Sequence, residues 1–155
     1  MPIIEATGSI FDCPATVLVS PVNCEGTMGA GLAREFARRY PDVEQAYIKH
    51  CRNGQVVIGH VNLYPVGNRT RVVACFPTKY KWKEPSRIEY IIGGLRSLVS
   101  KLDDNIGGHN DSIAIPALGC GLGGLSWSEV KPLIVQAFAQ IPDVTVYIFA
   151  PQEDK

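Results

Sequence analysis

Hydrophobic positions along the chain fall into two patterns: short continuous or alternating runs, and longer stretches with helical spacing. The short runs have the length and β-branched content of strands, and turn residues follow most of them. The longer stretches repeat their apolar residues at helical spacing, which indicates helices with one buried face. The pattern predicts strands over residues 3–6, 16–22, 61–66, 71–77, 113–115 and 144–149, and helices over residues 32–40, 42–51, 88–102 and 127–138.

Local signals predict where these helices begin and end. Pro41 is expected to end the first helix, and Asp42 is expected to cap the second. Ser86 and Ser126 each precede a glutamate with the spacing of a capping box, so each serine side chain is expected to bond to the helix that follows it. A polar loop is expected over residues 103–111.

The order of the elements predicts the fold class. Strands alternate with helices, and the strands over residues 61–66 and 71–77 look like an antiparallel hairpin with a longer loop. This order predicts an α/β fold, a three-layer α/β/α sandwich around a mixed, mostly parallel central sheet. Ligands of such folds bind beyond the carboxyl ends of the strands.

Composition narrows the class of protein. The 155 residues are 46% hydrophobic and 19% charged, so residues 1–155 are expected to form a single domain, with 152–155 as a tail. The formal net charge is zero, so a nucleic-acid contact would need a local basic patch. No apolar run approaches the roughly 18 residues of a membrane span, and no membrane association is expected. The five cysteines lack a Cys-x-x-Cys pair, which favours free thiols in the cytoplasm, with neither a metal nor a cofactor.

The stretch from Ser112 to Leu125, S-I-A-I-P-A-L-G-C-G-L-G-G-L, joins a strand to a glycine-rich loop and then to a helix. Glycines let backbone N–H groups approach an anion, and the helix N-terminus adds positive charge, so the stretch suits a phosphate. A tight turn without a ligand explains it equally well. A second glycine-rich loop over residues 26–31 is expected at the same edge of the sheet, which favours the phosphate. Neither loop matches a P-loop or a dinucleotide-binding motif with its acidic partner.

Two further features carry alternative interpretations. Asn23 ends a strand beside the first glycine-rich loop, where it is either a turn-former or a contact to a sugar hydroxyl. Lys79, Lys81 and Lys83 alternate with Tyr80 and Trp82. These lysines are either solvated, or one points into the site while the others, with the aromatic rings, grip a single-stranded nucleic acid.

Three motifs in order, N-C-E-G-T-M-G-A-G-L-A-R-E-F, F-P-T-K-Y-K-W and S-I-A-I-P-A-L-G-C-G-L-G-G-L-S-W, resemble those of the macrodomain family. The resemblance runs from about Gly8 to Phe149. Within the family the chain looks most like the branch that contains the DarG antitoxins, which remove ADP-ribose from DNA, and the terminal ADP-ribose protein glycohydrolases. This resemblance implies the macrodomain fold and an ADP-ribose site.

The resemblance also implies roles for individual residues. Lys79 and Asn23 are the candidate catalytic residues. Lys79 stands where this branch carries its catalytic lysine, which either attacks the anomeric carbon or stabilises the opened or departing sugar, and Asn23 would hold the distal ribose beside it. Lys81, Trp82, Lys83 and Arg87 are candidate nucleic-acid contacts. The expected ADP-ribose-binding residues are Ser9, Ile10, Asn23, Met28, Gly29, Ala30, Gly31, Thr78, Leu118, Gly119, Cys120, Gly121, Leu122, Gly123, Gly124 and Leu125.

Two departures from the family pattern shape the functional hypothesis. Ser9 replaces an aspartate that binds adenine in many macrodomains, which implies looser adenine selectivity or help from Asp12. Gly123 replaces the acid of the protein glycohydrolases, as in the DNA-directed relatives. The resemblance therefore implies a glycohydrolase that removes ADP-ribose from a modified base, thymine, in single-stranded DNA.

The same resemblance implies a wider biological setting. Such a glycohydrolase would be the antitoxin of an ADP-ribosyltransferase toxin, expected as a monomer. Alternatives are an ADP-ribose-1″-phosphate phosphatase or ester hydrolase, and an ADP-ribose reader without catalysis. The chain is either part of a longer antitoxin or a stand-alone macrodomain.

Overall fold

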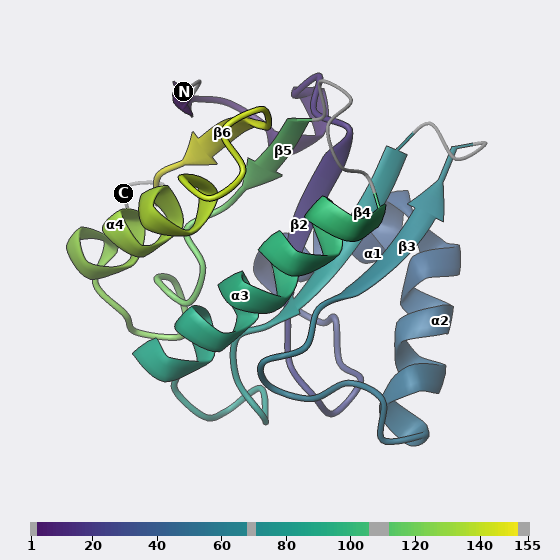
Figure 1. Ribbon diagram of the computed structural model, residues 1–155. Helices are drawn as coiled ribbons and strands as arrows, with labels where there is room; N and C mark the ends of the chain where they lie inside the picture. Colours follow the sequence, from purple (N-terminus) through teal and green to yellow (C-terminus); the bar gives the residue numbers. More distant parts are fainter. Residues whose placement is uncertain (1–2, 68–70, 106–111, 152–155) are drawn as a thin grey trace.

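A computed structural model describes residues 3–67, 71–105 and 112–151 of the chain, which form one sheet with helices on both faces (Figure 1). In chain order the elements are β1 (Ile3–Ala6), the 3-10 helix η1 (Ile10–Asp12), β2 (Val17–Val22), α1 (Gly31–Arg39), α2 (Pro41–Arg52), β3 (Asn62–Val66), β4 (Arg71–Pro77), α3 (Ile88–Asn105), β5 (Ser112–Ile115), α4 (Trp127–Phe138) and β6 (Thr145–Phe149). No helix in these ranges is both long and apolar enough to cross a membrane.

The sheet has the order β1-β6-β5-β2-β4-β3. All neighbouring strands are parallel except β3 and β4, which form the expected antiparallel hairpin. The prediction of a mixed, mostly parallel sheet is therefore confirmed. Parallel strands need crossover connections, and the helices supply them, so both faces of the sheet become covered.

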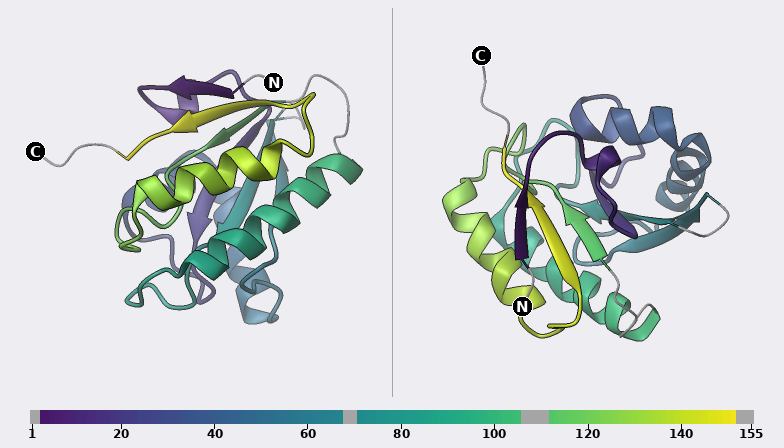
Figure 2. Two further views of the ribbon diagram at one scale, coloured as in Figure 1. Left: turned by 60° about the vertical axis from the view of Figure 1, so that its left-hand side comes forward. Right: turned by 90° about the horizontal axis from the view of Figure 1, so that it is seen from above.

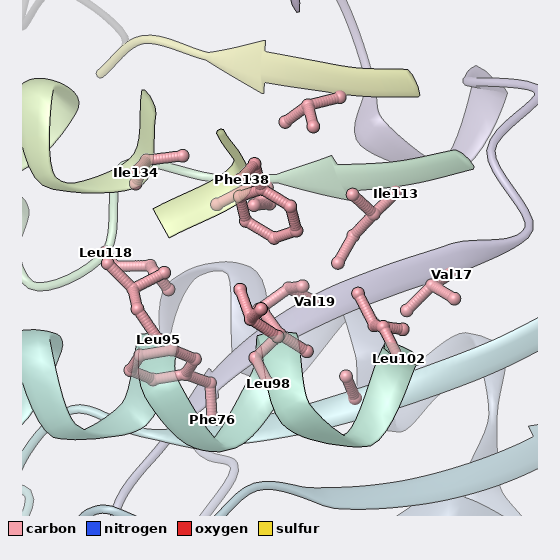
Figure 3. Close-up of a cluster of buried hydrophobic side chains, with 14 of the residues drawn as sticks. Val17, Val19, Phe76, Leu95, Leu98, Leu102, Ile113, Leu118, Ile134 and Phe138 are labelled. Atoms are coloured by element: carbon pink, nitrogen blue, oxygen red, sulfur yellow. The ribbon is translucent and has the colours of Figure 1, made fainter. Parts of the chain in front are cut away.

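Two hydrophobic cores lie on opposite faces of the sheet. Helices α3 and α4 cover one face, and α1 and α2 cover the other (Figure 2). Side chains of β2 alternate between them: Val17 and Val19 join the α3/α4 core, whereas Leu18 and Val22 join the other. Figure 3 shows Phe76 of β4 packed in the first core against Leu95 and Leu98 of α3.

Helix α3 lies close to the sheet because it carries a glycine at the contact. A Cβ atom at Gly94 would overlap the ring of Phe76, whose nearest atoms are closer than van der Waals contact allows. Ile92, which the apolar spacing predicts to be buried, lies at the margin of the buried face and is 36% exposed.

Two predicted helix boundaries and the predicted side-chain cap of α4 were wrong. Helix α2 begins at Pro41 and not after it, because proline is suited to the first turn, where no N–H donor is needed; Tyr40 and not Asp42 is the N-cap. Ser126 is the N-cap of α4, but its side chain bonds to Ser128 and makes no cap. The expected loop over residues 103–111 starts later, since α3 extends to Asn105; residues 106–111 lie outside the described ranges.

The topology brings the functional loops together. Strands β4, β2 and β5 are parallel neighbours, so their carboxyl ends share one edge of the sheet. From this edge the chain leaves β2 toward α1 and leaves β5 toward α4, on opposite faces (Figure 2). Two helix N-termini therefore meet at the edge where ligands bind in open α/β folds.

Candidate active site

Three loops at the carboxyl edge of the sheet contain most of the candidate residues. We call residues 23–30, after β2, the first glycine loop; residues 78–87, after β4, the lysine loop; and residues 119–125, after β5, the second glycine loop. The strands hold their starting points in register, because Val22 pairs with Pro77 on neighbouring parallel strands. The three loops are thus anchored side by side by the sheet itself.

Hydrogen bonds join the lysine loop to the first glycine loop. The N–H of Cys24 donates to the carbonyl of Tyr80 at 2.9 Å. In the opposite direction, the N–H of Trp82 donates to Oε1 of Glu25 at 2.8 Å. A third bond, from the N–H of Ser86 to the carbonyl of Gly123 at 3.0 Å, ties the lysine loop to the second glycine loop. The lysine loop is therefore connected to both glycine loops.

Asn23 holds the first glycine loop in shape from inside. Its side chain is buried, and Oδ1 accepts bonds from the N–H groups of Glu25 at 3.1 Å and Thr27 at 3.3 Å. Nδ2 donates to the carbonyl of Thr27 at 2.9 Å. The hydroxyl of Tyr47, from α2, reaches both Oδ1 at 2.8 Å and the carbonyl of Asn23 at 2.7 Å. These contacts fit the turn-forming interpretation of Asn23; its contact with a ribose stays a prediction.

The second glycine loop owes its shape to residues without side chains. Gly119 and Gly124 have positive φ angles of 73° and 81°, which only glycine adopts without strain. A Cβ at Gly119 would stand 2.7 Å from Cδ1 of Leu125, and one at Gly123 would stand 2.6 Å from the carbonyl oxygen of Gly119. The loop closes through the N–H of Leu125, which donates to the carbonyl of Gly119 at 2.8 Å.

Backbone donors at this edge suit an anion. Among the described residues, the N–H groups of Gly121, Leu122 and Gly123 donate to no protein acceptor. Helices α1 and α4 begin beside the two glycine loops, and neither has a side-chain hydrogen bond at its N-cap. Free N–H groups and the positive ends of two helix dipoles attract phosphate oxygens. The arrangement can hold a diphosphate.

Lys79 follows the end of β4 and is half-buried. Its ammonium donates to the carbonyl of Trp82, within its own loop, at 3.0 Å. Trp82 also donates its own N–H to the carboxylate of Glu25 in the first glycine loop. Trp82 thus connects Lys79 to the first glycine loop, and Lys79 lies in the loop that touches both candidate ligand-binding loops.

The candidate nucleic-acid contacts form an exposed surface on the lysine loop. Trp82 is 55% exposed, and the ammonium of Lys83 stands 5.3 Å from its ring centroid. Lys81 and Arg87 are also exposed, and none of these cations forms an ion pair within the described residues. An exposed aromatic ring among unpaired cations is a surface on which a base can stack while the cations contact phosphates.

Other expected ligand residues are placed differently. Ser9 caps η1, where its side chain accepts the N–H of Phe11, and Phe11 packs on Phe36 of α1 with ring centroids 4.7 Å apart. No hydrogen bond in the described ranges joins Ser9 to a glycine loop. The side chains of Ile10, Met28, Thr78 and Leu118 are buried, so a ligand would meet mainly their backbone. Exposed or half-buried positions are Gly29, Ala30, Gly31, Cys120 and Leu122.

Two hollows elsewhere on the surface are lined by none of the candidate site residues. One of about 370 Å³ lies between α3 and α4, and one of about 480 Å³ lies between the α1/α2 junction and β3. In the described part of the chain, no three His, Cys, Asp or Glu side chains are grouped to hold a metal ion.

The two cysteines of the glycine loops are poor nucleophiles. Burial, assisted by the neighbouring Cys51, raises the pKa of Cys24 from 9.0 to about 11. Burial also raises the pKa of the Cys120 thiol. The thiolate is the reactive form of cysteine, and a raised pKa makes it scarce near neutral pH. The site therefore leaves Lys79 as its main candidate for chemistry.

Sequence reasoning missed three contributors to the site. Tyr47 fits the apolar face of α2, which conceals the hydroxyl that reaches Asn23. Glu25 looks like an ordinary loop acid, and its bond to Trp82 spans 57 positions of the chain. Ser86 has the spacing of a helix cap but packs against the second glycine loop. No sequence signal could have revealed these contacts, because each joins elements that are brought together only by folding.

Residues 19–134 match the family model of the Macro domain. The chain belongs to the macrodomain family. This macrodomain is 42% identical over 149 residues to a DNA ADP-ribosyl glycohydrolase of Thermus aquaticus, an alignment that covers 95% of the chain and 41% of that relative. The chain thus spans about two fifths of the length of the curated relatives it matches first.

Solved structures place the macrodomain in the same branch. The macrodomain of Mycobacterium tuberculosis DarG superposes with a TM-score of 0.91 at 38% identity, covering 97% of this chain and 98% of that one. Thermosipho africanus DarTG in complex with ADP-ribose superposes with a TM-score of 0.90 at 31% identity, covering 99% of this chain and 43% of that one. The similarity to DarG macrodomains extends over nearly the whole chain.

Proposed function

We propose that this macrodomain is a DNA ADP-ribosyl glycohydrolase, which removes ADP-ribose from a modified thymine in single-stranded DNA. The observation that carries the proposal is the position of Lys79, in a loop bonded to both glycine loops, beside an exposed surface of aromatic rings and cations. The similarity to a Thermus aquaticus DNA ADP-ribosyl glycohydrolase supports the same reaction.

ADP-ribose would bind along the carboxyl edge of the sheet. The free N–H groups of residues 121–123 and the N-termini of α1 and α4 would hold the diphosphate. The first glycine loop would then face the distal ribose. The scissile N-glycosidic bond joins this ribose to the base, so the reacting carbon would lie between the first glycine loop and the lysine loop.

Lys79 has two possible roles in cleavage. In one, its neutral amine attacks the anomeric carbon while the bond to the base breaks and the base takes up a proton. The sugar ring then opens to an imine on Lys79, which water later hydrolyses. In the other, its ammonium stabilises charge on the opened or departing sugar. The covalent role requires Lys79 to give up its present bond to the carbonyl of Trp82, whereas the ammonium can keep that bond and use another N–H for the substrate. Reduction with borohydride during turnover separates them, since only the covalent adduct becomes trapped on Lys79.

The strand that carries the modified base would cross the lysine loop. Trp82 would stack a neighbouring base, and Lys81, Lys83 and Arg87 would contact phosphates. Each lost phosphate contact lowers the salt dependence of binding, so Lys81→Ala and Lys83→Ala should each reduce the slope of log affinity against log salt by about 1. An unmodified single strand measured at several salt concentrations provides this slope.

The deciding experiment is incubation with an ADP-ribosylated thymine oligonucleotide. The wild-type protein should release ADP-ribose, whereas Lys79→Ala should release it at least about 100-fold more slowly and bind free ADP-ribose as before. No release at enzyme excess would reject the proposal. Release at full rate by Lys79→Ala would show that the lysine is only a solvated surface residue.

One relative supports a proposal for the biological setting of this activity. One relative, from Thermosipho africanus, is a DNA ADP-ribosyl transferase fused to a DNA ADP-ribosyl glycohydrolase. We therefore propose that residues 1–155 act as one monomeric macrodomain, opposing a cognate ADP-ribosyltransferase toxin in the cytoplasm. The five free cysteines fit a reducing compartment. Rescue of cells that express the toxin, compared between wild type and Lys79→Ala, tests the pairing.

A further inference from the structure

Ser86 has a buried hydroxyl that lacks a partner at the edge of the candidate site. The residue closes the lysine loop just before α3 and is only 6% exposed. Its spacing to Glu89 predicts a capping box, but within the described residues Oγ makes no hydrogen bond. A buried polar atom without a partner destabilises the folded protein, so such atoms are rare unless water or a ligand satisfies them.

The Ser86 side chain is directed at the second glycine loop. Its Oγ is the atom nearest to a Cβ placed on Gly123, and its Cβ stands 2.9 Å from the same point. Its Cβ also lies 3.2 Å from a Cβ placed on Gly119. The hydroxyl therefore occupies the space in which a side chain at position 123 would begin, and the glycine leaves that space open.

The loop beside Ser86 contains backbone N–H groups that have no hydrogen-bond acceptor among the described residues. The free N–H groups of Gly121, Leu122 and Gly123 belong to the loop that Ser86 contacts, and α4 begins after this loop without a side-chain cap. One phosphate oxygen can accept several hydrogen bonds at once. The Ser86 hydroxyl lies against Gly123, in the same loop as these free N–H groups, and can add one more donor for an oxyanion held there.

We propose that Ser86 is a ligand-binding residue, whose hydroxyl donates to a diphosphate oxygen of ADP-ribose held on the second glycine loop. The inference rests on the proposed function only for the identity of the ligand. It also assigns a reason for glycine at position 123, because any side chain there would displace the Ser86 hydroxyl from the loop.

Calorimetry with ADP-ribose, ADP and AMP tests the role of Ser86. Ser86→Ala should lower the affinities for ADP-ribose and for ADP by the same factor, about tenfold, which corresponds to about 1.4 kcal/mol. The affinity for AMP should fall less, since AMP lacks the second phosphate. A lower affinity for ADP-ribose alone would overturn the assignment to the diphosphate, and unchanged affinities for all three nucleotides would show that water satisfies the hydroxyl.

Thermal unfolding of the free protein separates a binding role from a structural one. Because the Ser86 hydroxyl has no partner before the ligand binds, Ser86→Ala should keep or raise the melting temperature. A lowered melting temperature together with weaker binding would indicate a structural role and overturn the proposal. Ser86→Cys keeps the approximate shape of the side chain but offers only a weak donor, so it should lower the affinity for ADP-ribose about as much as Ser86→Ala does.

Ser20 provides a matched control. Its hydroxyl is also buried without a partner in the described residues, but it lies within β2, where strand alternation places it with Leu18 and Val22 on the face that α1 and α2 cover. Ser20→Ala should therefore leave the affinity for ADP and ADP-ribose unchanged. Equal weakening by the two variants would overturn the specific role of Ser86.

The two proposals can fail separately. If the wild type binds ADP-ribose and Ser86→Ala binds it equally well, only the Ser86 proposal fails. If the wild type binds ADP-ribose and depends on Ser86, but releases nothing from the modified oligonucleotide, only the proposed function fails.

Discussion

The two glycine loops reach the same edge of the sheet by opposite means. The first is organised by one buried side chain, Asn23, which bonds to Glu25, Thr27 and Tyr47. The second has no such central side chain. Its conformation depends on glycines at positions where a side chain would clash or where φ is positive. A change in side-chain chemistry should therefore damage the first loop, whereas added volume should damage the second.

The different construction of the two loops suits the different parts of ADP-ribose that they would bind. A loop built around a buried amide keeps a rigid wall beside a sugar, because its hydrogen bonds are shielded from water. A loop built from glycines exposes its N–H groups for an anion. The first loop therefore stabilises a shape, and the second leaves donors unused until a ligand arrives.

The largest effect is expected from Gly123→Ala in the second loop. The new methyl group would stand 2.6 Å from the carbonyl oxygen of Gly119 and closer still to Ser86, so the loop must move. We expect a loss of about 2 kcal/mol in unfolding free energy, measured in urea, and at least a tenfold loss of ADP-ribose affinity. Gly121→Ala is the control for stability, since nothing lies within 4 Å of its added Cβ. Equal destabilisation by both variants would contradict the steric explanation.

Asn23→Ala should cause a similar loss of unfolding free energy, about 2 kcal/mol. The change removes a buried amide and leaves the N–H groups of Glu25 and Thr27 without their acceptor. Hydrogen exchange at these two amides should become faster, while exchange in the second loop stays as it was. The control is Asn62→Ala, which removes one exposed side-chain bond to Gln55 and should cost less than about 1 kcal/mol.

Tyr47→Phe should have a smaller effect of about 1 kcal/mol. It deletes the hydroxyl shared between the carbonyl and the Oδ1 atom of Asn23, but keeps the buried ring. In a double-mutant cycle, Tyr47→Phe should cost clearly less in the Asn23→Ala background. Strict additivity would mean that the hydroxyl does not act through the Asn23 side chain.

The effect on stability at neutral pH is smallest for Cys24, because its thiol ionises only at alkaline pH. Burial raises the pKa of Cys24 to about 11, so at pH 8 its thiolate is about 100-fold scarcer than that of a thiol with a pKa of 9.0. Alkylation of Cys24 in the native protein should be slower by at least this factor than in the unfolded chain. Because the unfolded thiol ionises first, its contribution to stability should be lost between about pH 9 and 11. Rapid alkylation at pH 8 would show an accessible, activated thiol.

Much of the fold could be predicted from local patterns. The pattern predicts the strands over residues 3–6 and 71–77 at their observed ends, because period and turn residues are local properties. The helix ends were harder to place. Ser86 has the spacing of a cap, but packing against the second glycine loop overrides this local preference.

The sequence by itself determined the elements, the two glycine-rich loops and, through its three motifs, the macrodomain family. Only the tertiary structure decided what joins the loops: the bond between Glu25 and Trp82, the hydroxyl of Tyr47 on Asn23, and the unsatisfied hydroxyl of Ser86 beside Gly123. Hydrophobic spacing and glycine content act over a few neighbouring residues and can be read along the chain. A hydrogen bond between distant segments depends on where the sheet places their backbones, and no local pattern encodes that position.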